Sequence, residues 1–216
     1  MATYVDIVNN VLLRLREPVV TSVNDSTYAK LIGVLVNDAK REVEDAYDWN
    51  ALGSTVTVTT VSGTYNYTLT GSKTRFRLID VLNDTSNYTL QFAPTHWMNQ
   101  QFLLTTQGSN SPYYYNFNGV DSNGDTQVDL FPVPNGVYTI RFNMTVPQAD
   151  LATDSTVIKV PDHLVSQLAY AKAIAERGED AGVSSIEAFS IYRNSLADAI
   201  AIERNHYNDE VEWINP

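Results

Sequence analysis

Apolar residues near the start of the chain recur at intervals of three or four positions, the spacing of an amphipathic α-helix. The first apolar stripe consists of Val5, Val8, Leu12 and Leu15. Thr3 is placed to cap this helix, and Pro18 ends it. A second helix is expected to begin near Asp25 or Ser26. Its apolar face consists of Tyr28, Leu31, Leu35, Ala39, Val43 and Ala46.

The pattern changes to alternation after residue 53, which is typical of β-strands. Residues 54–61 read STVTVTTV, and further strand-like runs cover 65–69, 76–82, 88–92, 113–117, 128–131 and 137–146. Asn123-Gly124 and Asn135-Gly136 each suit a tight hairpin turn. Residues 95–104 predict one short helix. Strands at this spacing favour an antiparallel β-sandwich or an open barrel.

A helical pattern returns at Pro161. This residue marks the start of a helix, because proline suits the first helical position. The apolar stripe of this third helix consists of Leu164, Leu168, Ala171 and Ala175. Gly178 is expected to close it. Ser184 and Glu187 form a capping box that predicts the start of a fourth helix. The stripe of the fourth helix consists of Ile186, Phe189, Tyr192 or Arg193, Leu196 and Ile200.

The two pairs of helices predict one α+β chain with a discontinuous helical domain. Each pair is amphipathic and has too little apolar surface to be stable alone, so all four helices are expected to pack as an antiparallel bundle. Residues 1–52 and 159–207 would form this bundle. Residues 53–158 would form an inserted antiparallel β-sandwich or open barrel, and residues 208–216 would follow as a C-terminal tail.

The charge balance is acidic, with 14 basic and 25 acidic residues and a formal net charge of −11. This balance argues against a nucleic-acid grip, which needs a basic patch. The chain has no cysteine, so it fits a reducing compartment and has neither disulfides nor thiolate metal ligands. No apolar run reaches the ~18 residues of a membrane span, and no membrane partner is expected.

The sequence predicts no catalytic residue, no metal site and no cofactor. His96, His163 and His206 lie far apart and lack the spacing of zinc ligands. The segment Asp121–Asp125 offers oxygen ligands at alternate positions. It lacks the glycine and glutamate that an EF-hand loop has at its sixth and twelfth positions, so it is expected to form a polar hairpin turn.

The tyrosine run 113–115 leaves two other classes of function open. An exposed tyrosine face could bind sugars, which would make the chain a carbohydrate-binding or receptor-binding appendage module with a β-sandwich. The many carboxylates also allow a pair of acids for glycoside hydrolysis, although the sequence marks out no single pair. Neither alternative explains a pair of helices at each end of the chain.

The most specific stretch is Val128–Arg141, VDLFPVPNGVYTIR, followed by IKVPDHL at 158–164. With the helical frame and the aromatic break at 47–52, it resembles the head-to-tail adaptor proteins of short-tailed phages, also called tail tubular protein A. The resemblance implies a homo-oligomeric, dodecameric ring in the virion neck, assembled in the host cytoplasm. Its implied partners are the portal protein, the tail nozzle and tail fibres. DNA would pass through the ring during genome ejection without specific binding.

The C-terminal tail is the candidate partner interface. Trp213 and Ile214 are expected to be anchors on the portal or a neighbouring subunit, with Val211 as a further interface residue, because aromatic side chains dominate interface energies. The alternative is that Trp213 and Ile214 fold back onto the helical domain. The acidic residues that would steer the tail to a basic groove are Asp209, Glu210 and Glu212.

Overall fold

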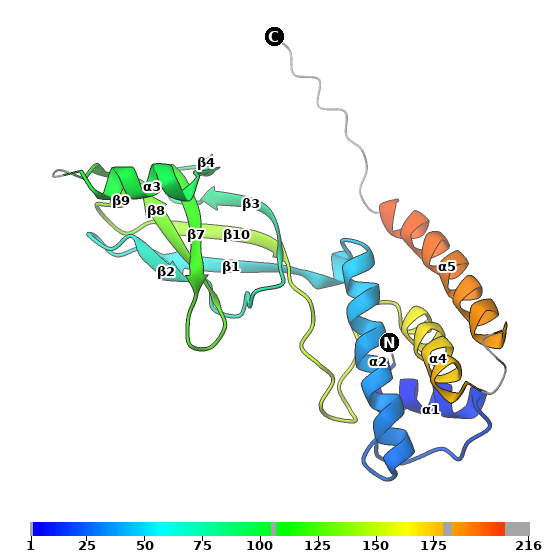
Figure 1. The fold of residues 1–216 in the computed structure, drawn as a ribbon. Helices are drawn as coiled ribbons and strands as arrows, with labels where there is room; N and C mark the ends of the chain where they lie inside the picture. The colour runs from blue at the N-terminus through cyan, green and yellow to red at the C-terminus, as the bar shows by residue number, and fades with distance from the viewer. Residues whose placement is uncertain (1, 105–106, 179–182, 206–216) are drawn as a thin grey trace. The chain divides into compact units, whose positions relative to one another are not determined.

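The computed structural model describes residues 2–104, 107–178 and 183–205. The chain divides into two compact units (Figure 1). The first contains residues 1–52 and 148–216 and is helical, and the second contains residues 53–147 and is built mainly of strands. The fold class is therefore α+β, as the sequence predicts.

The helical unit contains four long helices, which are α1 (Tyr4–Arg14), α2 (Thr27–Ala46), α4 (Asp162–Arg177) and α5 (Val183–Arg204). A short 3-10 turn, η1 (Asn50–Leu52), follows α2. The caps explain several of these bounds. Thr3 and Asp6 form a capping box at α1, Ser26 accepts a hydrogen bond from the backbone N–H of Ala29 at α2, and Gly178 closes α4 with a left-handed φ of 64°.

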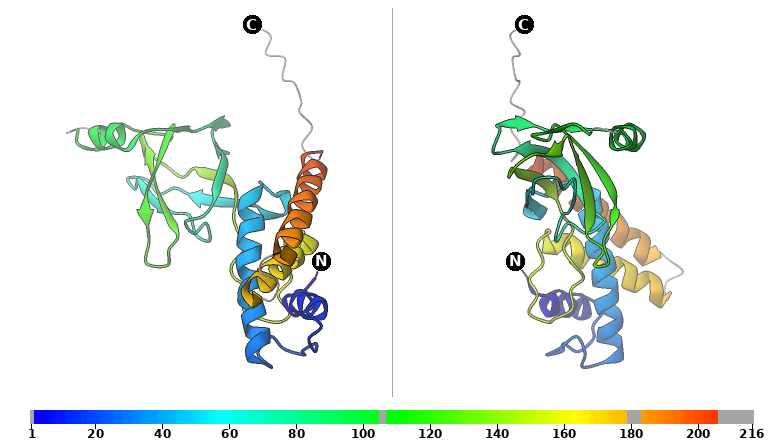
Figure 2. Two further views of the ribbon diagram at one scale, coloured as in Figure 1. Left: turned by 45° about the vertical axis from the view of Figure 1, so that its right-hand side comes forward. Right: turned by 90° about the vertical axis from the view of Figure 1, so that its left-hand side faces the viewer.

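Helix α4 lies at the centre of this unit and packs against α1, α2 and α5 (Figures 1 and 2). The buried face of α1 includes Val8, Leu12 and Leu15 of the predicted stripe, while Val5 is only half-buried. The face is wider than predicted, because Tyr4, Ile7 and Val11 are buried as well. On α2 the core side consists of Ala29, Ile32, Gly33, Val36, Ala39, Lys40, Val43 and Glu44. The predicted face of α2 lies partly beside this core, since Ala46 is exposed.

Helix α5 already includes Val183, one residue before the predicted cap Ser184. The predicted stripe is wrong in part, because Ile186 is exposed and the buried side chains are Ser185, Ala188 and Tyr192. The rest of the predicted stripe is confirmed, because Tyr192 is buried in the core and Phe189, Leu196 and Ile200 pack against it, whereas Ile191 and Ile202 lie outside the stripe and are exposed.

The β unit consists of two four-stranded sheets that share one apolar core, together with a two-stranded pair. The first sheet has the order β1 (Gly53–Thr59), β10 (Thr139–Thr145), β3 (Arg77–Asn83), β4 (Tyr88–Thr89). The second has the order β2 (Asn66–Thr68), β8 (Thr126–Phe131), β7 (Tyr114–Val120), β5 (Gln91–Phe92). The pair consists of β6 (Ser109–Asn110) and β9 (Val133–Pro134).

Most strand pairs are antiparallel, and the shared core gives the sandwich arrangement. The pairs β5–β7 and β6–β9 are parallel, which the sequence does not predict. The predicted short helix is present as α3 (Thr95–Phe102) and covers β7. Met98 of α3 is buried beside Ala93 and Phe131.

Residues 148–158 belong to the helical unit, although the sequence assigned them to the β region. Polar side chains of α2 hold this segment along its length. The Asn37 amide accepts from the backbone N–H of Leu151 at 2.8 Å and donates to the Leu151 carbonyl at 3.2 Å. The Lys40 ammonium donates to the Gln148 carbonyl at 2.6 Å. Pattern reading misses this attachment because the segment itself has neither helical nor strand periodicity.

Candidate partner interface

The predicted tail anchors Val211, Trp213 and Ile214 and the acidic residues Asp209, Glu210 and Glu212 all lie outside the described residues. The same holds for His206. Among the described residues, no three His, Asp or Glu side chains gather in a way that could hold a metal ion. His96 contacts Gln100 one turn along α3 at 3.1 Å, and His163 lies in the first turn of α4. Within the same described ranges no helix could span a membrane.

The segment Asp121–Asp125 forms a turn whose carboxylates are occupied by protein donors. Asp121 accepts from the backbone N–H groups of Asn123 at 2.8 Å and Asp125 at 2.9 Å. Asp125 lies 3.0 Å from the Lys73 ammonium, and the hydrogen bond from Lys73 lowers the pKa of this carboxyl below its usual value. The carboxylates therefore bind donors of the protein and stabilise the turn, in line with the expected polar hairpin.

Most of the tyrosine run packs against other side chains inside the β unit. Tyr115 is buried in the sandwich core, where burial raises the pKa of its hydroxyl. Tyr114 faces the other side of β7 and lies 4.9 Å from the ring of Trp97 on α3. Tyr113 is 47% exposed and stacks on Tyr88 at 4.6 Å. Only Tyr113 offers an open aromatic face, so the run does not form the continuous sugar platform that one alternative requires.

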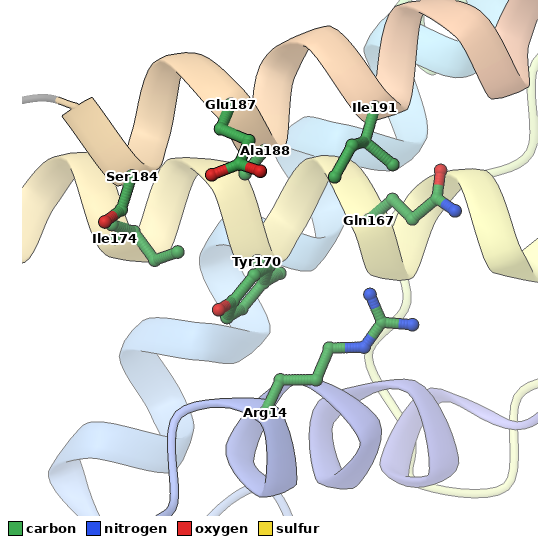
Figure 3. A pocket seen from close by; sticks show the side chains of 8 residues that line it. All are labelled: Arg14, Gln167, Tyr170, Ile174, Ser184, Glu187, Ala188 and Ile191. Carbon is green, nitrogen blue, oxygen red and sulfur yellow. The ribbon is translucent and has the colours of Figure 1, made fainter.

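A groove of about 280 Å³ opens on the helical unit between α1, α4 and α5 (Figure 3). Its lining side chains are Arg14 from α1, then Gln167, Tyr170 and Ile174 from α4, and Ser184, Glu187, Ala188 and Ile191 from α5. The volume lies just below the ~300 Å³ lower bound for pockets of drug-sized ligands. It therefore suits one or two side chains of a protein partner.

Charge is distributed unevenly along this groove. Figure 3 shows Arg14 reaching under Gln167 at one end, whereas Glu187 lies over Tyr170. The Arg14 side chain hydrogen-bonds Asn10 at 3.0 Å and lies 5.8 Å from the centre of the Tyr170 ring. No carboxylate pairs with this guanidinium within the described part of the chain. The Oε1 atom of Gln167 is buried and accepts no hydrogen bond from the described residues.

The outer surface of α5 carries large apolar side chains. Ile186 is 71% exposed, Ile191 is 52% exposed and Ile202 is 64% exposed. Ile191 and Ile202 are eleven residues apart, about three helical turns, so they lie on the same side of the helix. A helix that is apolar on more than one side usually contacts more than one partner. The sequence carries this signal in Ile191 and Ile202, which lie outside the predicted stripe.

The described residues thus define an interaction protein in which the helical unit leaves a groove and an apolar helix surface uncovered. A family model described as SU10 adaptor protein matches residues 2–213. The match covers nearly the whole chain, so the chain belongs to the SU10 adaptor protein family and is a phage structural adaptor protein. No curated protein matches the chain.

Proposed function

We propose that this adaptor is the head-to-tail connector of a short-tailed phage and forms a ring between the portal protein and the tail nozzle. The observation that carries the proposal is the family match over residues 2–213. The exposed apolar side chains of α5 support it, because a subunit of a ring needs such surfaces for its neighbours. In this role the protein is a virion component of the neck, assembled in the host cytoplasm.

Each unit has a proposed partner. The helical unit would contact the portal and neighbouring copies in a ring of twelve, and the β unit would contact the nozzle and tail fibres. The ring would line the DNA conduit used in genome ejection. A net charge of −11 per copy supports passage without tight binding, because a negative lumen does not hold the phosphate backbone.

The C-terminal tail is the proposed docking element on the portal. Trp213, Ile214 and Val211 would be its anchors, and Asp209, Glu210 and Glu212 would steer it toward a basic surface. The same segment has the highest density of acidic and aromatic residues near either end of the chain.

Co-sedimentation with the portal protein of the same phage tests this function. The full chain should pellet with purified portal rings, and the double variant Trp213→Ala/Ile214→Ala should stay in the supernatant. The matched control is Val137→Ala, which truncates an exposed side chain of the β unit. The docking role would be refuted if the full chain does not pellet with portal rings. It would also be refuted if the double variant binds them as well as the full chain does.

A further inference from the structure

We propose that the groove between α1, α4 and α5 is a peptide-binding site, and that its occupant in the free protein is the chain's own segment 208–216. The tail anchors that dock on the portal would then be covered until a portal is present. This inference rests on the proposed function only for the identity of the anchors, and its test needs no portal.

The groove and the segment carry complementary features in the same order. Approached from the C-terminal end of α5, the groove first presents the Arg14 guanidinium, which has no carboxylate partner among the described residues, and then the apolar surface of Tyr170 and Ile174 (Figure 3). Approached in the same direction, the segment first presents the carboxylates of residues 209–212 and then Trp213 with Ile214. A chain that doubles back along α5 therefore places its carboxylates beside the Arg14 guanidinium and its apolar side chains on the apolar surface of the groove.

The length of the segment allows this path within one copy. From Arg204 to Ile191 the helix rises about 20 Å over thirteen residues. Residues 205–213 span up to about 30 Å when extended, which leaves enough chain for the reversal.

The buried Gln167 Oε1 supplies a further reason for an occupant. A buried acceptor without a donor is costly, and a peptide chain brings N–H groups that could satisfy it. The indole N–H of a tryptophan is one such donor. The groove volume of about 280 Å³ matches one bulky side chain and a neighbour, which is the size of the Trp213-Ile214 pair.

Fluorescence anisotropy with a labelled peptide of residues 205–216 tests the site and its occupancy together. The peptide should bind the full-length Trp213→Ala/Ile214→Ala chain, whose own tail has lost its anchors. It should bind the wild-type chain at least tenfold more weakly, because a tethered segment competes at an effective concentration of about millimolar. A peptide with the Trp213→Ala change should bind at least about 30-fold more weakly than the unaltered peptide.

Two substitutions in the anchor-less chain locate the site. Arg14→Gln should weaken peptide binding about five- to tenfold, because one charge-assisted contact is lost. Arg193→Gln is the matched control, since Arg193 is exposed on α5 about 200° around the helix from Ile191, and it should leave binding unchanged. Circular dichroism of each variant confirms that the helices remain folded.

Three results would overturn the proposal. If the anchor-less chain does not bind the peptide, the groove is not a site for this segment. If wild-type and anchor-less chains bind it equally, the tail does not occupy the groove of its own copy. If wild-type chains associate through their tails in light scattering and the Trp213→Ala/Ile214→Ala change dissolves the assemblies, the occupant comes from a second copy.

Discussion

Gly33 permits a close approach between α2 and the residues that pack over it. A Cβ atom at this position would lie 2.4 Å from the Tyr4 hydroxyl oxygen and 2.7 Å from a methyl carbon of Val23, both of them buried residues. Gly33→Ala should therefore lower the free energy of unfolding by about 1 kcal/mol, since overpacking of about 1–3 kcal/mol outweighs the gain of about 1 kcal/mol in helix propensity. Urea unfolding measures the change.

Val34→Ala is the control for this prediction, because the neighbouring side chain is 57% exposed and its truncation should change stability by less than about 0.5 kcal/mol. A Gly33→Ala chain as stable as the wild type would show that Tyr4 and Val23 move aside without cost.

Lys40 and Glu44 form an ion pair on α2 that is completely buried. Their side chains meet at 3.1 Å, and both also bond the backbone of Gln148, through its carbonyl at 2.6 Å and its N–H at 3.1 Å. The pair therefore binds the point where the chain returns to the helical unit. Lys40→Met should destabilise the protein by about 3–5 kcal/mol, because it leaves a buried carboxylate without its cation.

A double-mutant cycle separates the pair from its surroundings. Lys40→Met/Glu44→Leu should lose less stability than the sum of the two single changes by at least about 1 kcal/mol, since the double variant leaves no unpaired charge. Additive losses in chemical unfolding would mean that the two side chains do not depend on each other.

Residue types alone predict some of these residue-scale features. Thr3, Ser26 and Gly178 are recognisable as caps because their local hydrogen-bonding roles depend on a few neighbouring residues. Lys40 and Glu44 look like an ordinary exposed i, i+4 pair in the sequence. Their burial comes from residues 148–151, more than a hundred positions away, and no local pattern records it.

At the scale of elements, the turn at 121–125 connects β7 to β8 and depends on Asp125. The hydrogen bond from Lys73 lowers the pKa of Asp125 in the folded state below the ordinary value of 3.8. The resulting stabilisation is therefore complete above pH 3.8 and is lost as the pH falls through the folded-state pKa. Asp125→Asn should flatten the decline in melting temperature below pH 4, as followed by circular dichroism.

Lys73→Met is the companion change, because it removes the donor and should flatten the same part of the curve. If the melting temperature falls as steeply below pH 4 in both variants as in the wild type, the contact between Lys73 and Asp125 does not cause the decline.

The elements also show where periodicity succeeds and where it fails. The helices and the alternating strands β1 and β10 follow directly from the spacing of their apolar residues. Two-residue strands such as β5 and β6 are too short to carry any period, so their parallel pairing is not predictable. The candidate groove was missed for a related reason, since it is formed by side chains of α1, α4 and α5 that are up to 177 positions apart.

For the whole molecule, the division into two units predicts independent folding of the β unit. The sandwich has its own core, with Val58, Val81, Val128, Ile140 and Phe142 buried at its centre. A fragment of residues 53–147 should therefore unfold cooperatively, whereas residues 1–52 alone should not, because α1 and α2 need α4 to cover them. Calorimetry of both fragments measures this, and cooperative melting of 1–52 would contradict the shared helical unit.

A second prediction at this scale concerns DNA. A chain with a net charge of −11 should bind duplex DNA only weakly at physiological salt. Electrophoretic mobility of labelled duplex mixed with the chain checks this. Tight binding that weakens steeply as salt is added would show a phosphate-binding surface and would conflict with a passive conduit.

Mass photometry of purified portals titrated with the full chain tests most directly whether the protein forms a ring on the portal. One saturable species that carries twelve added chains per portal ring is expected, with mostly monomeric adaptor in the absence of portal. Portals whose mass is unchanged at saturating adaptor, or adaptor rings that form equally well without a portal, would contradict it.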